Sequence, residues 1–557
     1  MAEDIYALCD ALVDETAALS PSAATMLGIK GYDHLWDDFS TEGCEEQQRV
    51  AEGQLARVRA AEVGTDPWAA LAAEVAAAAI ADELARFETD EHLRDLNNLA
   101  STLQHVRDVF DHMGKGSREE WEAVTSRLEG LPKVLDAYAR RLEDGRQRGL
   151  AVARRQAAEG VRQARHAAGE ESTLLRLFAE WEAAAIGDDA LGRRVAEGVA
   201  AGRAAFSSLA DYLEADYLPA AGEEDGVGEE RYSRLARRFL GSSPDLRATY
   251  EWGWAEVDRL LRRMRETAEA ISPGASLAEA LHLLQEDPAR AAASPAEFRE
   301  LMQERQATAL AELEGVHFDV PELIRRVDVK LAPPGGALGA FYVGPSEDFS
   351  RPGTVWFAIG GLQVVPLFDQ VSTAYHEGFP GHHLQNGIQL ASAARLSRFQ
   401  KLLVWYPGSG EGWALYAEDL MEELGYLEKP DYLMGKLASE MLRACRVAID
   451  IGSHLRLPIP QGQPFHPGEE WTFDAGVEML VDYAAQSPDV ARSELTRYLG
   501  WPGQAIAYKV GQQAIRDLRA EAQRRHGAAF DRKAFHARVL EIGSVGLDVL
   551  RRHLAGF

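Results

Sequence analysis

Helical patterning over more than half of the chain constrains the fold most. From residue 1 to about residue 320, segments rich in Ala, Leu, Glu and Arg space their apolar residues three and four apart, which is typical of amphipathic helices. The clearest helical segments are 46–63, 68–87 and 191–217. Helix starts are indicated by Ser-x-x-Glu sequences at Ser117, Ser276 and Ser294, in which Ser and Glu satisfy free backbone amides. The pattern predicts a mainly α protein.

The pattern changes near residue 327. Alternating or β-prone residues occur at 327–331, 340–343 and 354–359, separated by Pro- and Gly-rich turns. These segments predict a small sheet that comes just before the next helix. We expect one of its strands to line a cleft, where an extended peptide can add to the sheet edge.

A histidine-rich stretch follows the predicted sheet: His376-Glu377-Gly-Phe-Pro380-Gly-His382-His383. Two His one helical turn apart, with Glu beside the first, is the arrangement that binds zinc and activates water in metallopeptidases. On this interpretation His376 is a metal ligand and Glu377 is the general base, because neutral imidazole binds zinc and a carboxylate accepts the proton of the attacking water. The alternative is a polar helix cap near a turn.

The spacing of this stretch departs from an ordinary zinc helix. The position one turn after His376 is Pro380, which removes a backbone hydrogen bond and clashes with the preceding turn. In an unbroken helix His383 would return to the face of His376, whereas looping out Pro380-Gly381 brings His382 there instead. We expect the looped-out pair, with His382 as the second ligand. His383 then supports the site or the substrate from beside it, or replaces His382, and a buried histidine with satisfied hydrogen bonds is an equal alternative.

A second motif, Glu411-Gly-Trp-Ala-Leu-Tyr-Ala-Glu418, offers the third ligand. A zinc site with two His needs another protein ligand, commonly a carboxylate on the next helix, and leaves a fourth position for water. Glu411 is predicted to be that ligand, and a carboxylate that merely stabilises a helix N-terminus is the alternative. Glu418 lies two turns further on the same face and is expected to support the ligands.

These two motifs resemble the bacterial domain-of-unknown-function family 885. The resemblance is strongest from about residue 330 to 520 and extends to Tyr342-Val-Gly-Pro345, Ser350-Arg-Pro-Gly353, and Pro502-Gly-Gln-Ala505 with Tyr508. The family is similar in fold to the thermostable carboxypeptidase Taq family of zinc peptidases. The resemblance therefore implies a large helical zincin-like peptidase fold with a small β-sheet beside the metal helix. It also favours His382, because the His directly after Pro-Gly is the recurring one.

Three residues outside the two motifs are candidates for contact with substrate. Hydrolysis of an amide needs a donor for the developing oxyanion, and Tyr508 is our candidate for it. Arg351 and Arg443 are candidates to hold a substrate carboxylate, as a carboxypeptidase requires. The alternatives are core packing for Tyr508 and structural ion pairs for the two arginines.

The formal net charge of −29 argues against nucleic-acid binding and against anionic membrane surfaces, because both need clustered Lys and Arg. Cys9, Cys44 and Cys445 are widely spaced and predict reduced thiols rather than disulfides. Neither a signal peptide nor a long apolar span is apparent. We therefore expect a cytoplasmic protein and leave its oligomeric state open.

We expect two regions that form one continuous structural unit: a helical N-terminal region, residues 1–320, and a catalytic region, residues 321–557, with the sheet and the metal site. The predicted function is that of a zinc-dependent, carboxypeptidase-like metallopeptidase that holds one divalent ion and hydrolyses peptide or peptide-like amide bonds. The alternatives are a metal-dependent hydrolase or lyase of a small metabolite, and a non-catalytic helical binding protein with a relic site.

Overall fold

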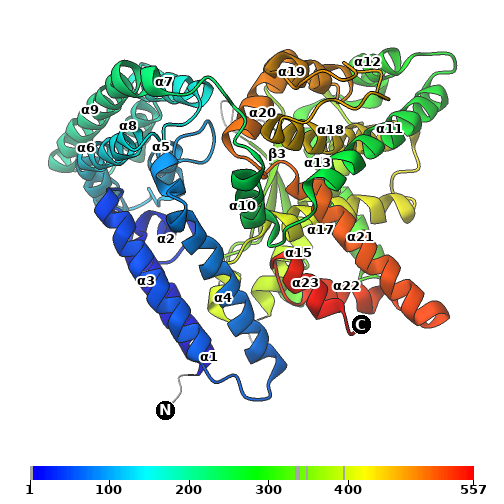
Figure 1. The fold of residues 1–557 in the computed structure, drawn as a ribbon, viewed down its shortest axis with the longest axis horizontal. Coiled ribbons are helices and arrows are strands. Elements are labelled where there is room, and N and C mark those ends of the chain that lie inside the picture. Colours follow the sequence, from blue (N-terminus) through cyan, green and yellow to red (C-terminus); the bar gives the residue numbers. More distant parts are fainter. Residues whose placement is uncertain (1–3, 333–338, 347–348, 393–394) are drawn as a thin grey trace. The chain divides into compact units, whose positions relative to one another are not determined.

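The structure, a computed structural model, describes residues 4–332, 339–346, 349–392 and 395–557. The chain divides into two compact units. Unit 1 comprises Met1–Val227 with Thr496–Trp501, and unit 2 comprises Gly228–Leu495 with Pro502–Phe557. Figure 1 shows how helices dominate the described chain, which confirms the predicted mainly α fold.

Unit 1 is built from helices. They are α1 (Ile5–Leu19), α2 (Pro21–Met26), α3 (Thr41–Ala60), α4 (Pro67–Glu88), η1 (Glu91–Arg94), α5 (Thr102–Asp108), η2 (Val109–His112), α6 (Arg118–Gln147), α7 (Arg154–Ala168), α8 (Thr173–Ala184), α9 (Asp189–Tyr212), η3 (Leu213–Tyr217) and η4 (Leu218–Ala220). The predicted segments 46–63, 68–87 and 191–217 correspond to α3, α4 and α9, the last of which gives way to a π turn at Leu213.

The core of unit 1 lies between α6 and the helices α7, α8 and α9, which run side by side in Figure 1. Leu128, Leu131 and Phe206 are fully or almost fully buried there, and the rings of Trp121 and Trp181 meet edge to face at 5.2 Å. The predicted capping box of Ser117 at the start of α6 is confirmed. The apolar spacing of three and four in the sequence is therefore the spacing that faces this core.

Unit 2 contains helices and two small sheets. Its elements are α10 (Glu229–Leu240), α11 (Leu246–Ile271), α12 (Leu277–Glu286), η5 (Pro288–Arg290), β1 (Ala291–Ala292), α13 (Pro295–Leu313), η6 (Glu322–Ile324), β2 (Val327–Leu331), β3 (Gly339–Val343), β4 (Gly353–Ala358), β5 (Val365–Pro366), α14 (Gln370–Glu377), α15 (His382–Ala391), α16 (Arg398–Leu402), α17 (Pro407–Glu423), α18 (Pro430–Leu455), α19 (Phe473–Asp482), α20 (Pro488–Gly500), α21 (Ala507–His526), η7 (Gly527–Ala529), α22 (Arg532–Leu540) and α23 (Leu547–Leu554). The end of α20 groups with unit 1.

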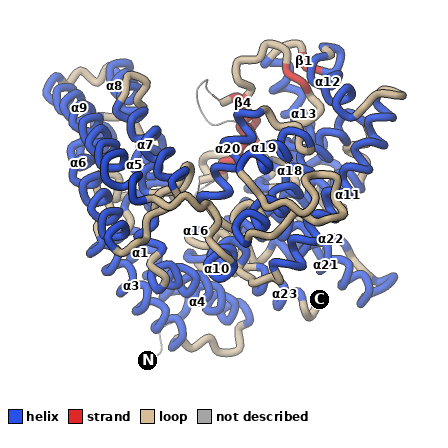
Figure 2. The backbone as a smooth tube through the Cα atoms, turned by 45° about the horizontal axis from the view of Figure 1, so that its top comes forward, coloured by secondary structure: helices blue, strands red, loops and turns tan. Residues whose placement is uncertain are grey.

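The predicted sheet is present directly before the histidine-rich stretch. Its order is β2-β4-β3, with β2 parallel and β3 antiparallel to β4, so that Val329 and Tyr342 both pair with Val355. A second sheet joins β1 to β5. In the described chain the strands, red in Figure 2, all belong to unit 2. Among the described residues β3 pairs on one side only, which leaves its other edge open.

The division between the units falls at residue 227 rather than near the predicted residue 320. Helices α10 to α13 belong with the C-terminal part of the chain because their apolar faces pack there: α11 lies along α18, and α13 packs against β2 and α14. Hydrophobic spacing predicts each helix but contains no information about which partner covers its apolar face.

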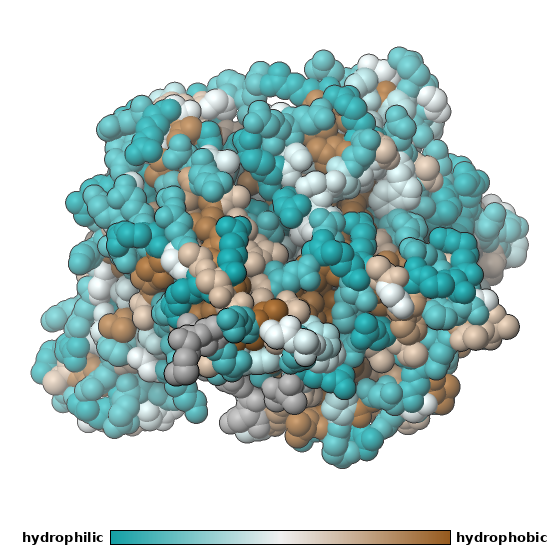
Figure 3. All heavy atoms as spheres, turned by 60° about the horizontal axis from the view of Figure 1, so that its bottom comes forward, coloured by the Kyte–Doolittle hydropathy of each residue, from teal (hydrophilic) through white to brown (hydrophobic). Residues whose placement is uncertain are grey.

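Polar residues dominate the face of the molecule drawn in Figure 3. Hydrophilic side chains cover most of the face drawn in Figure 3, and hydrophobic ones are scattered between them. Among the described helices, none combines the length and the low polarity that a bilayer crossing requires.

Candidate metal centre

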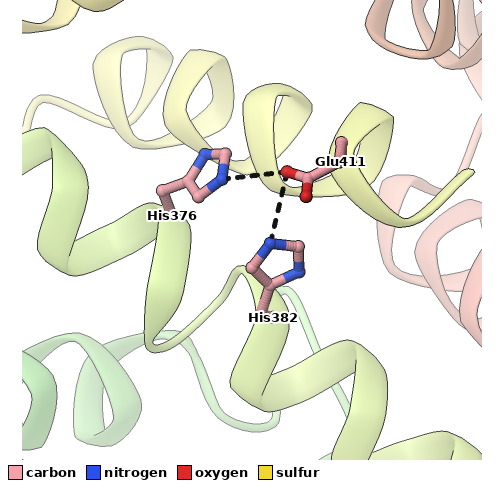
Figure 4. Close-up of side chains that lie close together, drawn as sticks. All are labelled: His376, His382 and Glu411. Carbon is pink, nitrogen blue, oxygen red and sulfur yellow. Dashed lines mark ion pairs between the residues drawn. The ribbon is translucent and has the colours of Figure 1, made fainter. Parts of the chain in front are cut away.

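The histidine-rich stretch forms two helices and the link between them. Helix α14 ends at Glu377, and α15 begins at His382. Figure 4 shows His376 near the end of the first helix and His382 at the start of the second. The expected continuous helix with a looped-out Pro380-Gly381 pair is therefore wrong in form: Pro380 ends the first helix, as its missing amide and its ring require. The chain changes direction between the two histidines.

Two side chains from other helices hold this link in place. Gln306 of α13 accepts a hydrogen bond from the amide of Phe379 at 2.6 Å and donates one to the carbonyl of Ala374 at 2.7 Å. Trp413 of α17 donates its indole N–H to the carbonyl of Pro380 at 2.9 Å. Gly381 approaches the end of α14 so closely that a Cβ there would lie 1.9 Å from the carbonyl oxygen of His376. The link is thus rigid and buried.

Helix α17 brings the carboxylates to the histidines. It packs along α21 with backbone against backbone: a Cβ on Gly412 would lie 2.5 Å from the carbonyl carbon of Gly511. This close contact fixes the position of Glu411, because Glu411 is adjacent to Gly412 in the sequence. The Gly412 position in the second motif is therefore explained by helix packing.

The structure brings His376, His382 and Glu411 together. Nε2 of His376 lies 3.3 Å and Nε2 of His382 lies 3.5 Å from the same oxygen of Glu411, and the two imidazole rings meet edge to face with centroids 5.0 Å apart. One ligand atom from each of the three residues lies within 4.8 Å of the others. Both histidines are buried, so this is a desolvated group of donors.

Glu418 sets the orientation of the first imidazole. Nδ1 of His376 lies 2.8 Å from Oε1 of Glu418, whose other oxygen accepts a hydrogen bond from Ser372. Because a carboxylate can only accept here, Nδ1 carries the hydrogen and neutral His376 presents a lone pair at Nε2. That lone pair faces the lone pairs of Glu411, which is unfavourable unless a cation lies between them.

The pKa shifts of His376 and Glu411 also indicate that the site favours a positive charge. Burial alone would lower the pKa of His376, but its hydrogen bonds to Glu411 and Glu418 raise that pKa to about 10. Burial alone would raise the pKa of Glu411, but the two histidines lower it well below its usual range. A divalent ion would take the place of the protons, and two imidazole nitrogens with a carboxylate oxygen are donors that zinc accepts. The three residues therefore fit such an ion.

Glu377 lies at the end of α14 beside this group. Its side chain is half-buried, and it makes no hydrogen bond or ion pair with the residues that the structure describes. Burial raises the pKa of Glu377, and the negative charge of Glu411 acts in the same direction. A carboxylate that makes no ion pair with a described residue and whose pKa is raised is suited to accept a proton.

Arg443 and Tyr508 lie on the Glu377 side of the site. The guanidinium of Arg443 lies close enough to lower the pKa of Glu377, and its carbon is 5.9 Å from the centre of the Tyr508 ring. Arg443 donates to Ser439 of its own helix and has no carboxylate partner among the described residues, and its Nε is buried without a hydrogen bond. Arg446 covers the Tyr508 ring at 4.8 Å.

His383 points away from the metal-ligand group. Its Nδ1 lies 3.0 Å from the hydroxyl of Tyr342 on β3, and its Nε2 lies 2.8 Å from the carbonyl of Ile324. Burial lowers the pKa of His383 to about 4. The structure therefore gives His383 a role in attaching α15 to the sheet rather than contact with the ligands. Arg351 is exposed in the turn before β4, near Tyr342. Among the described residues, no contact joins Arg351 to the ligand residues.

Several residues near the site were missed by the sequence analysis. Gln306, Ser372 and Trp413 hold the link and Glu418, and Trp405 borders the ligands. The indole of Trp405 is 44% exposed, lies over Gly410 and has its centre 6.0 Å from that of the His382 ring. Trp405 comes just before the Pro-Gly-Ser-Gly sequence that opens α17. This place in the sequence was the only feature by which the sequence analysis could have identified Trp405.

A mainly α protein that gathers two imidazoles and a carboxylate from three helices belongs to the class of helical proteins with a candidate metal centre. This chain belongs to the family described as "Bacterial protein of unknown function (DUF885)", which it matches over residues 21–554. The predicted family is thereby confirmed. The predicted likeness of its fold to carboxypeptidase Taq stays a prediction.

Two solved structures resemble the chain over its full length. One is described as "the putative lipoprotein from Colwellia psychrerythraea", with a TM-score of 0.86, 22% identity, and coverage of 99% of this chain and 98% of that one. The other is "a putative lipoprotein of unknown function from Shewanella oneidensis", with a TM-score of 0.75, 16% identity and complete coverage of both chains. No curated protein matches this chain. At these identities the likeness establishes the fold alone.

Proposed function

We propose that this protein is a zinc-dependent metallopeptidase, carboxypeptidase-like, that hydrolyses peptide or peptide-like amide bonds. One observation carries the proposal: both Nε2 atoms converge on one oxygen of Glu411, while Glu418 occupies the other nitrogen of His376. Carboxylate support of a ligating imidazole is a recurrent feature of protein zinc sites.

In this proposal each nearby residue has a separate task. His376, His382 and Glu411 would hold the zinc ion, which when bound would supply the Lewis acidity that makes water nucleophilic near pH 7. Glu377 accepts the proton of the attacking water and returns it to the leaving amine. Tyr508, whose ring centre lies 5.9 Å from the guanidinium carbon of Arg443 and 4.8 Å from that of Arg446, is proposed to donate a hydrogen bond to the developing oxyanion.

The surroundings support a peptide as the substrate. Strand β3 contacts α14 and, through Tyr342, His383 of α15. Its unpaired edge is of the kind to which an extended peptide can add. Arg443 is available for a substrate carboxylate, since it forms no ion pair with a described residue. Arg351 is the second candidate for that contact, at the exposed end of the same sheet.

The test combines metal analysis with digestion of a peptide library by the purified protein. We expect close to one zinc per chain, loss of turnover on chelation, and recovery with zinc. Glu377→Gln should keep the metal and the fold but reduce turnover by a factor of about 10⁴, the upper end of the range for general acid-base catalysis. Glu286→Gln, at an exposed helix position, is the matched control and should behave as wild type.

Each alternative gives a different result in this experiment. A protein that holds zinc but leaves every peptide intact is a hydrolase or lyase of a small metabolite, and a protein without metal is a binding protein with a relic site. Turnover that survives Glu377→Gln would refute the general-base assignment. Cytoplasmic location also remains a proposal, supported by the three buried free cysteines.

A further inference from the structure

Unit 1 contains a cavity of about 460 Å³ that the metal centre does not explain. It is lined by parts of α2, α4, α5 and the loops that join them. Its lining includes apolar side chains, among them Met26, Phe39 and Leu99, and polar ones, among them Asp37, Gln104 and His105. Its size is within the range of small-molecule sites.

Buried polar groups concentrate around this cavity. Asp37, Ser101, Thr102, Gln104 and Arg141 line it and are each less than 9% exposed. Burial of polar side chains in a helical unit is costly unless each finds a partner, and apolar residues would serve packing alone better. Ser101, Thr102 and Arg141 find such partners in Gln104 and Asp95, so that Asp37 is the buried polar residue of the lining to account for.

The hydrogen bonds of Ser22 determine which atoms of Asp37 and His105 remain free to accept a hydrogen bond from a ligand. Its hydroxyl lies 2.6 Å from Oδ1 of Asp37 and 2.5 Å from Nε2 of His105, and its amide donates to the same carboxylate oxygen at 2.8 Å. A hydroxyl has one hydrogen, and the carboxylate can only accept, so that hydrogen goes to Asp37. His105 must then donate from Nε2. Neutral His105 consequently has its lone pair at Nδ1, and burial favours the neutral form by lowering the pKa of His105.

Two acceptors are left without partners. Oδ2 of Asp37 and Nδ1 of His105 make no hydrogen bond with the described residues, and neither atom is fully shielded from solvent. Both residues line the cavity. A ligand that donates hydrogen bonds would satisfy both atoms together.

The charges of the lining residues favour a positively charged ligand. The other charged side chains of the lining already have ion-pair partners, as Arg86 with Glu83, Arg141 with Asp95, and Asp108 with Arg107. Asp37 has no ion-pair partner among the described residues. The buried Arg127 is bound by backbone carbonyls and Thr25 and acts on Asp37 only through space. A carboxylate that is nine-tenths buried and lacks a direct counter-charge favours a cationic donor.

We propose that unit 1 binds a small molecule with a primary ammonium group, which donates to Asp37 and His105 while its apolar part contacts Met26, Phe39 and Leu99. Two free acceptors are fewer than the three or four protein ligands of a zinc site, whereas an ammonium group has three hydrogens to donate. This site is independent of the proposed peptidase reaction.

The test uses the full-length protein and two simple probes, 1-aminobutane and 1,4-diaminobutane, in isothermal titration calorimetry at neutral pH. We expect saturable binding of one probe molecule per chain and none of 1-butanol. Asp37→Asn should weaken binding by about tenfold to a hundredfold, the effect of a hydrogen bond to a charged group. Asp136→Asn in the same unit is the control, because its side chain is 64% exposed. Weak, non-saturable binding that both variants share would overturn the proposal.

A second measurement keeps the proposal testable if Asp37→Asn does not fold. Wild-type protein is photolabelled with an alkyl diazirine that carries a primary amine, and the labelled peptides are identified by mass spectrometry. We expect labels within residues 20–47 and 95–108, and their loss in the presence of excess 1,4-diaminobutane. Labels elsewhere, or labels that the competitor leaves unchanged, would refute the site.

Discussion

The two nitrogens of His376 have separate tasks. One donates to Glu418, and the other faces Glu411 together with His382. The partner of Nδ1 therefore decides which atom is available to a metal. His382 lacks this support, because its Nδ1 is buried without a partner among the described residues. The first imidazole is thus the better oriented of the two.

The adjacent residues His382 and His383 provide a matched pair of variants. His382→Ala should strip the metal and leave the fold intact, because it removes one of three donors. His383→Ala should keep the metal but lower the free energy of unfolding by about 1–3 kcal/mol, since it leaves the Tyr342 hydroxyl and the Ile324 carbonyl unpaired. Metal content and urea unfolding measure the two effects. Loss of metal in the His383 variant alone would reverse the ligand assignment.

The exposed indole of Trp405 should contribute to substrate selection. Trp405→Ala is expected to retain the metal and to lower kcat/KM about tenfold for peptides with a large apolar residue, because the variant loses the apolar contact between that residue and the indole. Peptides with Gly at that position should be cut as by wild type, and Trp405→Phe should recover part of the loss. An equal loss for both kinds of peptide would assign Trp405 a purely structural role.

At the scale of elements, the link between α14 and α15 decides the site. Two helices at an angle place His376 and His382 around one point, which Pro380 prevents a single helix from doing. Gln306 and Trp413 fix the link from α13 and α17. Ligand geometry therefore depends on helices that lie far apart in sequence.

Gly381→Ala tests this dependence on the link. The added Cβ would lie 1.9 Å from the carbonyl oxygen of His376 and 2.5 Å from that of Tyr375, so that the link must move and His382 with it. We expect metal affinity to fall at least tenfold and stability to fall by about 1–3 kcal/mol, the usual cost of overpacking. Gly462→Ala, where a Cβ meets nothing within 4 Å, is the control. Unchanged zinc affinity in the Gly381 variant would contradict a rigid link.

At the scale of the molecule, acid sensitivity of unit 2 should arise in part from His536. This residue is fully buried, lies against the Phe318 ring and contacts the Tyr416 hydroxyl at 2.9 Å. Burial lowers its pKa from 6.5 to about 3. Between these values the unfolded chain binds a proton that the folded chain refuses, so stability is complete above about pH 6.5 and falls as the pH drops.

Urea unfolding between pH 4 and pH 7 measures this contribution. The full effect of the shift is roughly 5 kcal/mol, and wild type should lose stability on acidification more steeply than His536→Phe, which keeps an aromatic ring without a titrating group. The slopes are compared rather than the absolute stabilities, because the variant also loses two hydrogen bonds. Parallel slopes would show that His536 does not contribute.

The sequence by itself determined the helical class, several helix starts and the residue types of the candidate site. These follow from local rules: apolar spacing of three to four residues, capping by Ser with Glu, and the proximity in sequence of His376, Glu377 and His382. Glu411 and Glu418 were predictable because their separation of seven residues places both on one helix face. Zinc binding, the zincin-like likeness and peptidase activity stay predictions.

Only the tertiary structure decided how the chain bends at Pro380, where His383 points and which helices form unit 2. Each of these depends on contacts between distant segments, such as Gln306 with the link, Tyr342 with His383, and α11 with α18. Local periodicity specifies which face of a helix is apolar and leaves open which partner buries it. That choice comes from the packing of all the helices together, and it turns a broken zinc motif into a convergent set of donors.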